Sequence, residues 1–121
     1  MVDDEQALLE ITARLLKTQG YQIITAGSGD EALALYKKQE ATIDLVVMDL
    51  NMPGMGGDKC LQEILKISPE AKVIITSGYL RDLDSKDISA AGAAGYIEKP
   101  YKSSILLRTI REVLDGKKNK V

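Results

Sequence analysis

The sequence predicts a three-layer α/β domain in which a parallel sheet lies between two layers of helices. Short apolar runs rich in β-branched residues alternate along the chain with segments whose apolar residues recur at helical spacing. Strands that alternate with helices in this way form βα units, and right-handed crossovers place the helices on both faces of a parallel sheet. A length of 121 residues suits one such domain with a core of normal size.

The composition excludes several classes of function. The net charge of −2 gives no basic surface for direct nucleic-acid binding, and no apolar run is long enough to span a membrane. The chain has no histidine, which excludes Ser-His-Asp and Cys-His catalysis and histidine-ligated zinc sites. Cys60, the one cysteine, excludes an internal disulfide, and we interpret it as a packing residue in a protein of the reducing cytoplasm.

Four elements are predicted before Asp49. They are an amphipathic helix at residues 6–19, a β-branched strand at 21–25, a second helix at 29–39 and a buried apolar strand at 43–48. Gly20 ends the first helix, and Ser28 with Glu31 forms a capping box at the start of the second. The last of these strands stops at Asp49, before a turn-forming stretch that contains Pro53 and three glycines.

Five elements are predicted in the second half of the chain. They are a helix at residues 58–67, a buried strand at 71–76, a weaker Ala-rich helix at 82–91, a short strand at 96–97 and a last helix at about 103–115. Pro69 ends the first of these helices. Ser103 or Ser104 caps the last helix, and Gly116 ends it. Residues 117–121 form a charged tail or the start of a linker.

Polar residues stand at the ends of several predicted strands. Asp49, Thr76 and Lys99 each close or follow a strand, and the pair Asp3-Asp4 stands near the start of the chain. Ligands of open α/β sheets bind beyond the carboxyl ends of the strands, so these side chains are candidates for one site. Taken singly, each also fits a structural role as a strand end, an acid at a helix N-terminus, a β-branched strand residue or a surface lysine.

In this order the motifs resemble those of one family, the receiver domains of two-component response regulators, from Asp3 to about Gly116. The motifs are Asp3-Asp4, Asp49 with residues 52–57 (MPGMGG), Thr76-Ser77-Gly78, and Tyr96 with Lys99-Pro100. The resemblance implies a flavodoxin-like fold whose parallel five-stranded sheet has the order 2-1-3-4-5. It also implies a single receiver domain over residues 1–116.

The resemblance implies that Asp49 accepts a phosphoryl group from a histidine kinase or a phosphotransfer domain. It implies a magnesium ion bound by the carboxylates of Asp3, Asp4 and Asp49 and by the backbone carbonyl of Asn51. The Thr76 hydroxyl and the Lys99 ammonium would contact the phosphoryl oxygens. The peptide bond between Lys99 and Pro100 would be cis, an uncommon form even before proline, and it would aim the lysine.

The resemblance also implies a switch. Thr76 would move toward the phosphoryl group and Tyr96 would rotate inward, which would change the surface of the fourth helix, the fifth strand and the last helix. Asn51 and Gly78 occupy the positions at which the family tunes the lifetime of the phosphoryl group. The output partner is unknown, and the resemblance allows a homodimer through the fourth-helix face.

The chemistry of these residues supports the resemblance. Three carboxylates in one crevice repel one another unless a cation intervenes, and magnesium prefers a few carboxylate oxygens, waters and a phosphate. Phosphoryl transfer needs positioning and charge neutralisation more than an acid or a base, so a carboxylate, a metal and a lysine are sufficient. The donor brings the histidine. The domain would catalyse only its own phosphorylation and dephosphorylation, so we do not expect an enzyme.

The chain departs from the family pattern at its first strand, because only Met1 and Val2 precede the acid pair. That strand should be central in the sheet, and without it the second and third strands would lack their shared partner. Three explanations stay open. The N-terminus is trimmed from a longer natural chain, which we favour, or the strand is rudimentary, or another copy supplies it.

Two other functions stay open as alternatives. One is a pseudo-receiver, in which the same fold is a binding module that works without phosphorylation, although the intact Asp49, Thr76 and Lys99 argue against it. The other is a small flavodoxin-like enzyme or nucleotide binder. We disfavour it because the chain has neither a GxGxxG nor a GxxxxGK[ST] phosphate loop.

Overall fold

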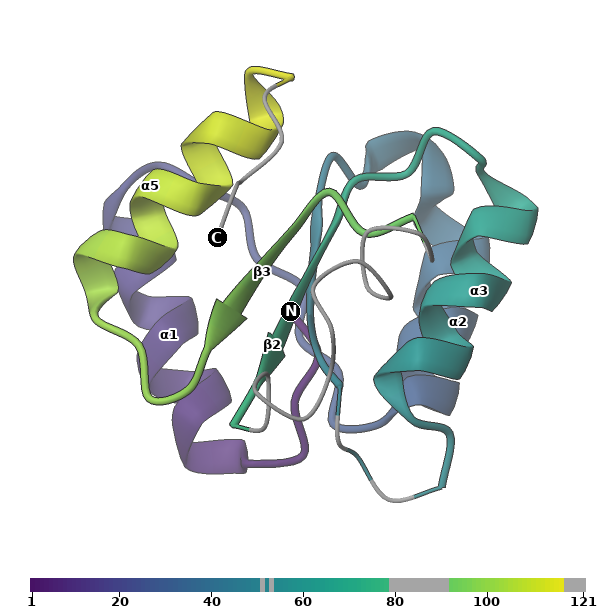
Figure 1. The fold of residues 1–121 in the computed structure, drawn as a ribbon, viewed down its shortest axis with the longest axis horizontal. Coiled ribbons are helices and arrows are strands. Elements are labelled where there is room, and N and C mark those ends of the chain that lie inside the picture. Colours follow the sequence, from purple (N-terminus) through teal and green to yellow (C-terminus); the bar gives the residue numbers. More distant parts are fainter. Residues whose placement is uncertain (51, 53, 79–91, 117–121) are drawn as a thin grey trace.

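The computed structural model describes residues 1–50, 52, 54–78 and 92–116, and in this part of the chain a parallel sheet lies between two layers of helices (Figure 1). The helices are α1 (Gln6–Thr18), α2 (Gly29–Gln39), α3 (Gly57–Ile67) and α5 (Ser103–Leu114). Figure 1 shows α1 and α5 on one side of the sheet, and α2 and α3 on the other. The predicted three-layer α/β architecture is therefore confirmed. None of the helices described is both long and apolar enough to cross a membrane.

The sheet of the described residues has three parallel strands, which lie in chain order. They are β1 (Val46–Asp49), β2 (Val73–Ser77) and β3 (Gly95–Glu98). Every residue of β1 and β2 is buried, as expected for central strands covered by helices on both faces. The register sets Asp49 beside Thr76, and Thr76 beside Ile97.

The first strand of the predicted order is reduced to a bridge at Val2. Val2 pairs in parallel with Met48 on one side and with Ala26 on the other. Its N–H donates to Val47 O at 2.7 Å, and its carbonyl accepts from Asp49 N–H at 2.9 Å. The segments at Ala26 and Val2 therefore lie beside β1, β2 and β3 in the order 2-1-3-4-5, which confirms the predicted fold. Among the described residues, the first strand of this order is the short segment at Met1–Asp3.

Two local predictions are wrong. Residues 21–25 do not form a strand, although Ala26 makes a bridge. Their neighbour in the sheet is only the short segment at Met1–Asp3, so β-branched side chains alone do not build a ladder there. Neither Ser103 nor Ser104 caps α5, because the N-cap residue is Lys102 and it makes no side-chain cap. The predicted helix at 82–91 and the tail at 117–121 lie outside the described residues.

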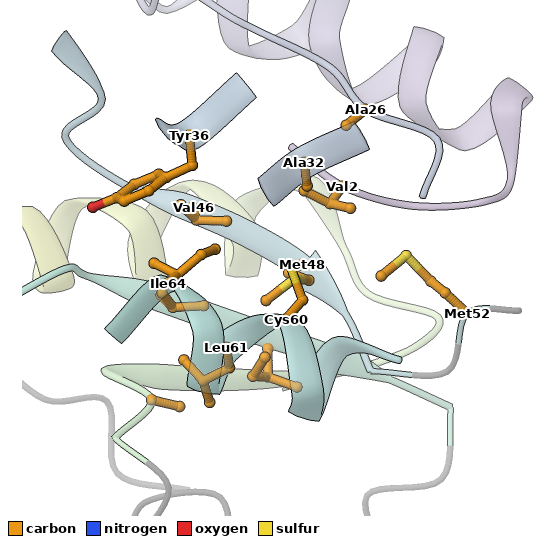
Figure 2. Packing of buried hydrophobic residues seen from close by; sticks show 13 residues of the cluster. Val2, Ala26, Ala32, Tyr36, Val46, Met48, Met52, Cys60, Leu61 and Ile64 are labelled. Atoms are coloured by element: carbon orange, nitrogen blue, oxygen red, sulfur yellow. The ribbon is translucent and has the colours of Figure 1, made fainter. Parts of the chain in front are cut away.

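The core consists of two apolar clusters, one on each face of the sheet. Figure 2 shows the cluster under α2 and α3, in which Met48 of β1 packs with Leu61 and Ile64 of α3. The cluster under α1 and α5 contains Ile74 of β2 with Leu106 and others. The alternation of side chains along each strand fills both clusters. Cys60 is fully buried in the first cluster, which fits the predicted packing role.

Candidate functional site

The site forms where β1, β2 and β3 end, because the parallel register brings their last residues together. Asp49 is the last residue of β1, and Thr76 lies beside it in β2. Lys99 follows β3 directly, and its N–H donates to Ser77 O at 2.9 Å. The peptide bond between Lys99 and Pro100 is cis. The strand ends therefore place a carboxylate, a hydroxyl and an ammonium group at one edge of the sheet.

The acid pair joins this edge through the short first strand. Carboxylate oxygens of Asp3, Asp4 and Asp49 all lie within 4.8 Å of one another. Asp3 and Asp49 are buried, whereas Asp4 is exposed. Asp3 N–H donates to Ala26 O at 3.1 Å, and its Oδ1 accepts from Glu5 N–H at 2.9 Å. Two or three residues of strand are thus enough to hold the acid pair beside Asp49.

Lys99 is the cation of the cluster. Its Nζ donates to Asp3 Oδ2 at 2.6 Å, and it lies 3.3 Å from Asp49 Oδ2 and 3.9 Å from Glu5 Oε1. Burial alone would lower the pKa of Lys99, but the hydrogen bond to Asp3 and the charges of Asp49 and Asp3 outweigh burial, so its pKa is raised. Lys99 is therefore charged at neutral pH.

The residues of the cluster fit a divalent cation. Three carboxylates face one ammonium group, so negative charge is in excess. Carboxylate oxygens are the ligands that Mg²⁺ takes in proteins, together with water and phosphate. The exposed Asp4 leaves the cluster open to solvent on one side. The candidate ligand at Asn51 and its neighbour Pro53 lie outside the described residues.

The other predicted residues lie around this cluster. Thr76 is buried, and Gly78 is exposed with open space around its backbone. Tyr96 is half-buried in β3 beside Ile75, where it packs against the α2 and α3 cluster rather than into the acid cluster. The structure thus brings together the charged side chains of four predicted residues, which are Asp3, Asp4, Asp49 and Lys99. Thr76 lies beside Asp49 in the strand register. Tyr96 lies in β3, outside this cluster.

The glycine that begins α3 fixes the distance between this helix and the site. Gly57 N–H donates to Leu50 O at 2.8 Å. A Cβ on Gly57 would meet the backbone of Asp49 and would lie 2.7 Å from Leu50 Cα. Only glycine fits there, so the last residue of the MPGMGG stretch lets the helix pack directly on the strand that carries Asp49.

Sequence reasoning missed two residues that lie near the site. Glu5 stands at 3.9 Å from the Lys99 ammonium, and Tyr101 has a buried hydroxyl whose pKa is raised by that burial. The signal in both cases was proximity in sequence, because Glu5 follows the acid pair and Tyr101 follows Lys99-Pro100. Proximity alone does not separate such residues from ordinary surface neighbours.

Comparison with known proteins places the chain in one family. A family model described as the response regulator receiver domain matches residues 1–111. The chemotaxis protein CheY of Thermotoga maritima is 32% identical over 114 residues, which are 93% of each protein. The sensor kinase CckA of Brucella abortus is 35% identical over 115 residues, which are 95% of this chain and 12% of that protein. Several relatives are therefore much longer than this chain.

Solved structures agree with the fold. A response regulator receiver domain protein from Clostridium thermocellum has a TM-score of 0.89 and 31% identity, over 95% of this chain and 91% of that one. CheY in a CheX–CheY–BeF3–Mg complex from Borrelia burgdorferi has a TM-score of 0.88 and 33% identity, over 93% of this chain and 84% of the chain matched. The second structure is thus a receiver relative in complex with a partner protein, a magnesium ion and BeF3.

Proposed function

Because the chain belongs to the family of response regulator receiver domains of two-component systems, we propose that Asp49 is its phosphoacceptor. The observation that carries the proposal is the position of the Asp49 carboxylate at the end of β1. Carboxylates of Asp3 and Asp4 lie within 4.8 Å of it, and the Lys99 ammonium lies 3.3 Å from Asp49 Oδ2. No observation favours the pseudo-receiver.

In the proposed reaction an Asp49 carboxylate oxygen attacks the phosphorus of a phosphohistidine on a kinase or phosphotransfer domain. The oxygen–phosphorus bond forms as the phosphorus–nitrogen bond breaks, and the electron pair stays on the imidazole. The Lys99 ammonium exchanges one of its carboxylate contacts for a hydrogen bond to a phosphoryl oxygen. The Thr76 hydroxyl donates to another phosphoryl oxygen. The same groups serve dephosphorylation, in which water attacks the phosphorus of the acyl phosphate, inorganic phosphate leaves and the Asp49 carboxylate is restored. The domain therefore catalyses only its own phosphorylation and dephosphorylation.

Magnesium is the proposed cofactor. Asp3, Asp4 and Asp49 would hold it with the backbone carbonyl of Asn51, and when bound it supplies charge neutralisation for the transferred group. The excess of carboxylates over ammonium groups supports this assignment. Asn51 and Gly78 would tune the lifetime of the acyl phosphate, because they flank Asp49 and Thr76 in the chain.

The proposed output is a change of surface. A phosphoryl group adds charge and acceptor oxygens, and contacts to it from Thr76 would free the space into which Tyr96 turns. The responding surface would comprise β3, α5 and the segment between residues 79 and 91, where an output partner or a second copy would dock. We place this receiver domain over residues 1–116, in the cytoplasm, without direct contact to nucleic acid or membrane.

The proposal is tested by intact mass after incubation with acetyl phosphate, with and without Mg²⁺. We expect the parent chain to gain one phosphoryl group only when Mg²⁺ is present, and Asp49→Asn to gain none. Asp44→Asn is the matched control, because Asp44 is exposed at the opposite end of the same strand segment, and it should behave as the parent does. A folded parent that gains no mass, or an Asp49→Asn protein that does gain it, contradicts the proposal.

The switch has a separate test. Beryllofluoride with Mg²⁺ mimics the phosphoryl group, and we expect it to shift the ring resonances of Tyr96. The ring resonances of Tyr36, which lies on the buried face of α2, should stay in place. If Tyr96 and Tyr36 respond equally or not at all, the switch role of Tyr96 is wrong, whereas the role of Asp49 is untouched.

A further inference from the structure

Glu5 places a further carboxylate at the solvent side of the acid cluster of Asp3, Asp4 and Asp49. Its Oε1 lies 3.9 Å from Lys99 Nζ, and the Glu5 side chain is 66% exposed, whereas that of Lys99 is 15% exposed. Asp3, which the same ammonium group contacts at 2.6 Å, is buried. The Lys99 ammonium therefore lies between buried carboxylates and one exposed carboxylate that faces solvent.

The backbone holds Glu5 at this place independently of its side chain. Glu5 N–H donates to Asp3 Oδ1 at 2.9 Å, and Glu5 is the N-cap residue of α1. Side chains that cap a helix there are usually those of Ser, Thr, Asp or Asn, and the Glu5 side chain makes no cap hydrogen bond. Its charge favours the positive end of the helix dipole. Replacing the carboxylate therefore removes that small stabilisation and leaves the backbone contact with Asp3 in place.

The Lys99 ammonium links Glu5 to the phosphoryl site. A phosphoryl oxygen that accepts a hydrogen bond from Lys99 Nζ lies about 3 Å from that nitrogen. Because Glu5 Oε1 is 3.9 Å from the same nitrogen, the phosphoryl oxygen and the Glu5 carboxylate are at most about 7 Å apart while Lys99 keeps this position. That separation is shorter than the Debye length of about 10 Å at 0.1 M salt, so the two negative charges repel each other.

The repulsion depends on the charge that the phosphodonor brings. Acetyl phosphate is a dianion at neutral pH, whereas phosphoramidate carries one net negative charge. A phosphohistidine whose imidazole is protonated also carries one, because the ring offsets part of the phosphoryl charge. Coulomb energy at a given distance is proportional to charge, so the Glu5 carboxylate disfavours a dianionic donor about twice as much as a monoanionic one.

We propose that Glu5 is a specificity-determining residue that selects the phosphodonor by charge. It disfavours small dianionic acyl phosphates, and it thereby favours donors of lower negative charge, such as a protonated phosphohistidine. The proposal rests on the phosphoacceptor role proposed for Asp49 and adds which donors the site takes. Glu5 has no part in the bond-making step.

The test compares the parent chain with Glu5→Gln in their initial rates of phosphorylation by acetyl phosphate and by phosphoramidate. Both donors are used below saturation, with saturating Mg²⁺ at low salt, and intact mass follows the reaction. We expect Glu5→Gln to raise the rate constant about fivefold with acetyl phosphate and about twofold with phosphoramidate, so that the ratio of the two rises about 2.5-fold. Effects on helix stability, Mg²⁺ binding or Asp49 reactivity act on both donors and cancel in the ratio.

Two variants serve as matched controls. Glu10 is also exposed and lies on α1, so Glu10→Gln makes the same change in net charge more than one helical turn away from Glu5. Glu5→Asp keeps the charge at the proposed position. Both variants should keep the donor ratio of the parent. In high salt the ratio of Glu5→Gln should return to that of the parent, because salt screens the repulsion.

Three results would overturn the selection by Glu5 and leave the phosphoacceptor role intact. They are an unchanged donor ratio in Glu5→Gln, an equal rise of the ratio in Glu10→Gln, and a rise that persists in high salt. The second would assign the effect to net charge, and the third to a contact that is not electrostatic. A folded parent chain that gains no phosphoryl group from either donor would instead overturn the phosphoacceptor role, and the selection by Glu5 with it.

Discussion

The two ends of the sheet differ in how completely they are built. At the carboxyl end, Asp3 is 1% exposed and Lys99 bridges it to Asp49. At the amino end, the walls of an apolar cleft face one another, and Ile24 is 38% exposed. One short strand segment, Met1–Asp3, serves both ends, because Val2 bonds to Val47 and Asp49 of β1 while Met1 and Asp3 bond to Ala26 on the other side. The difference teaches that placing the acid cluster takes only the last residues of that strand, whereas closing the core takes more.

The largest effect that sharpens this comparison concerns two leucines. Leu61 is 2% exposed in the closed cluster under α3, whereas Leu35 is half-buried at the cleft. We expect Leu61→Ala to lower the free energy of unfolding by about 3 kcal/mol. Leu35→Ala should lower it by about 1 kcal/mol, since part of its surface is already hydrated. Urea denaturation of both variants measures the difference, and equal losses would mean that the cleft is closed in solution.

A second prediction concerns the contact of α3 with the site. Gly57→Ala should lower the free energy of unfolding by about 2 kcal/mol, because the new Cβ meets the backbone of Asp49 and Leu50. Gly27→Ala is the matched control, since its Cβ meets only the Glu31 side chain, at 3.9 Å, and it should change stability by less than about 0.5 kcal/mol. Thermal unfolding compares the two. If Gly57→Ala leaves the free energy of unfolding unchanged, the start of α3 is not in close contact with the end of β1.

How much of this comparison is predictable from sequence depends on the range of the interactions. Asp49 was found because a buried run stops there at a turn, which is a local signal. The ion pair of Lys99 with Asp3 joins residues 96 positions apart, and no local pattern predicts it. The resemblance to a family placed both residues in one site, but it implied a contact of Lys99 with a phosphoryl oxygen and not with Asp3. The strand expected at 21–25 failed because a strand needs a neighbour, and β-branched side chains do not reveal that the neighbour is short.

The third prediction tests what holds the closed end together. Lys99→Met leaves the Asp3 and Asp49 carboxylates without their ammonium partner. We expect the free energy of unfolding to fall by about 1–2 kcal/mol in the absence of metal. This loss is smaller than for a wholly buried ion pair, because the cluster opens to solvent at Asp4. Mg²⁺ should restore more stability to Lys99→Met than to the parent, since the lysine no longer competes for the carboxylate oxygens. Thermal unfolding with and without Mg²⁺ decides, and Lys102→Met, on the exposed side chain before α5, is the control.

The last prediction asks whether the open end of the sheet loosens the closed one. Cys60 is a residue of α3 and is fully buried in the core cluster that α2 and α3 cover. Burial, then the charges of Asp30 and Glu63, raise its pKa from 9.0 to about 11. We expect labelling of this thiol at pH 8 to be at least ~1,000-fold slower in the native chain than in denaturant, since it must wait for opening.

The pH dependence of the same thiol gives the sign of its contribution to stability. Between pH 9 and about 11 the unfolded chain loses the thiol proton while the native chain keeps it, so the free energy of unfolding falls as pH rises through this window. Below pH 9 the thiol does not make the free energy of unfolding depend on pH. Cys60→Ser, which removes the titrating group, should flatten the decline above pH 9 in a series of urea denaturations.

The labelling experiment can contradict this view of the core. Fast labelling of Cys60 at pH 8 would mean that opening at the cleft extends through the sheet as far as α3, and that the two ends of the molecule are not independent.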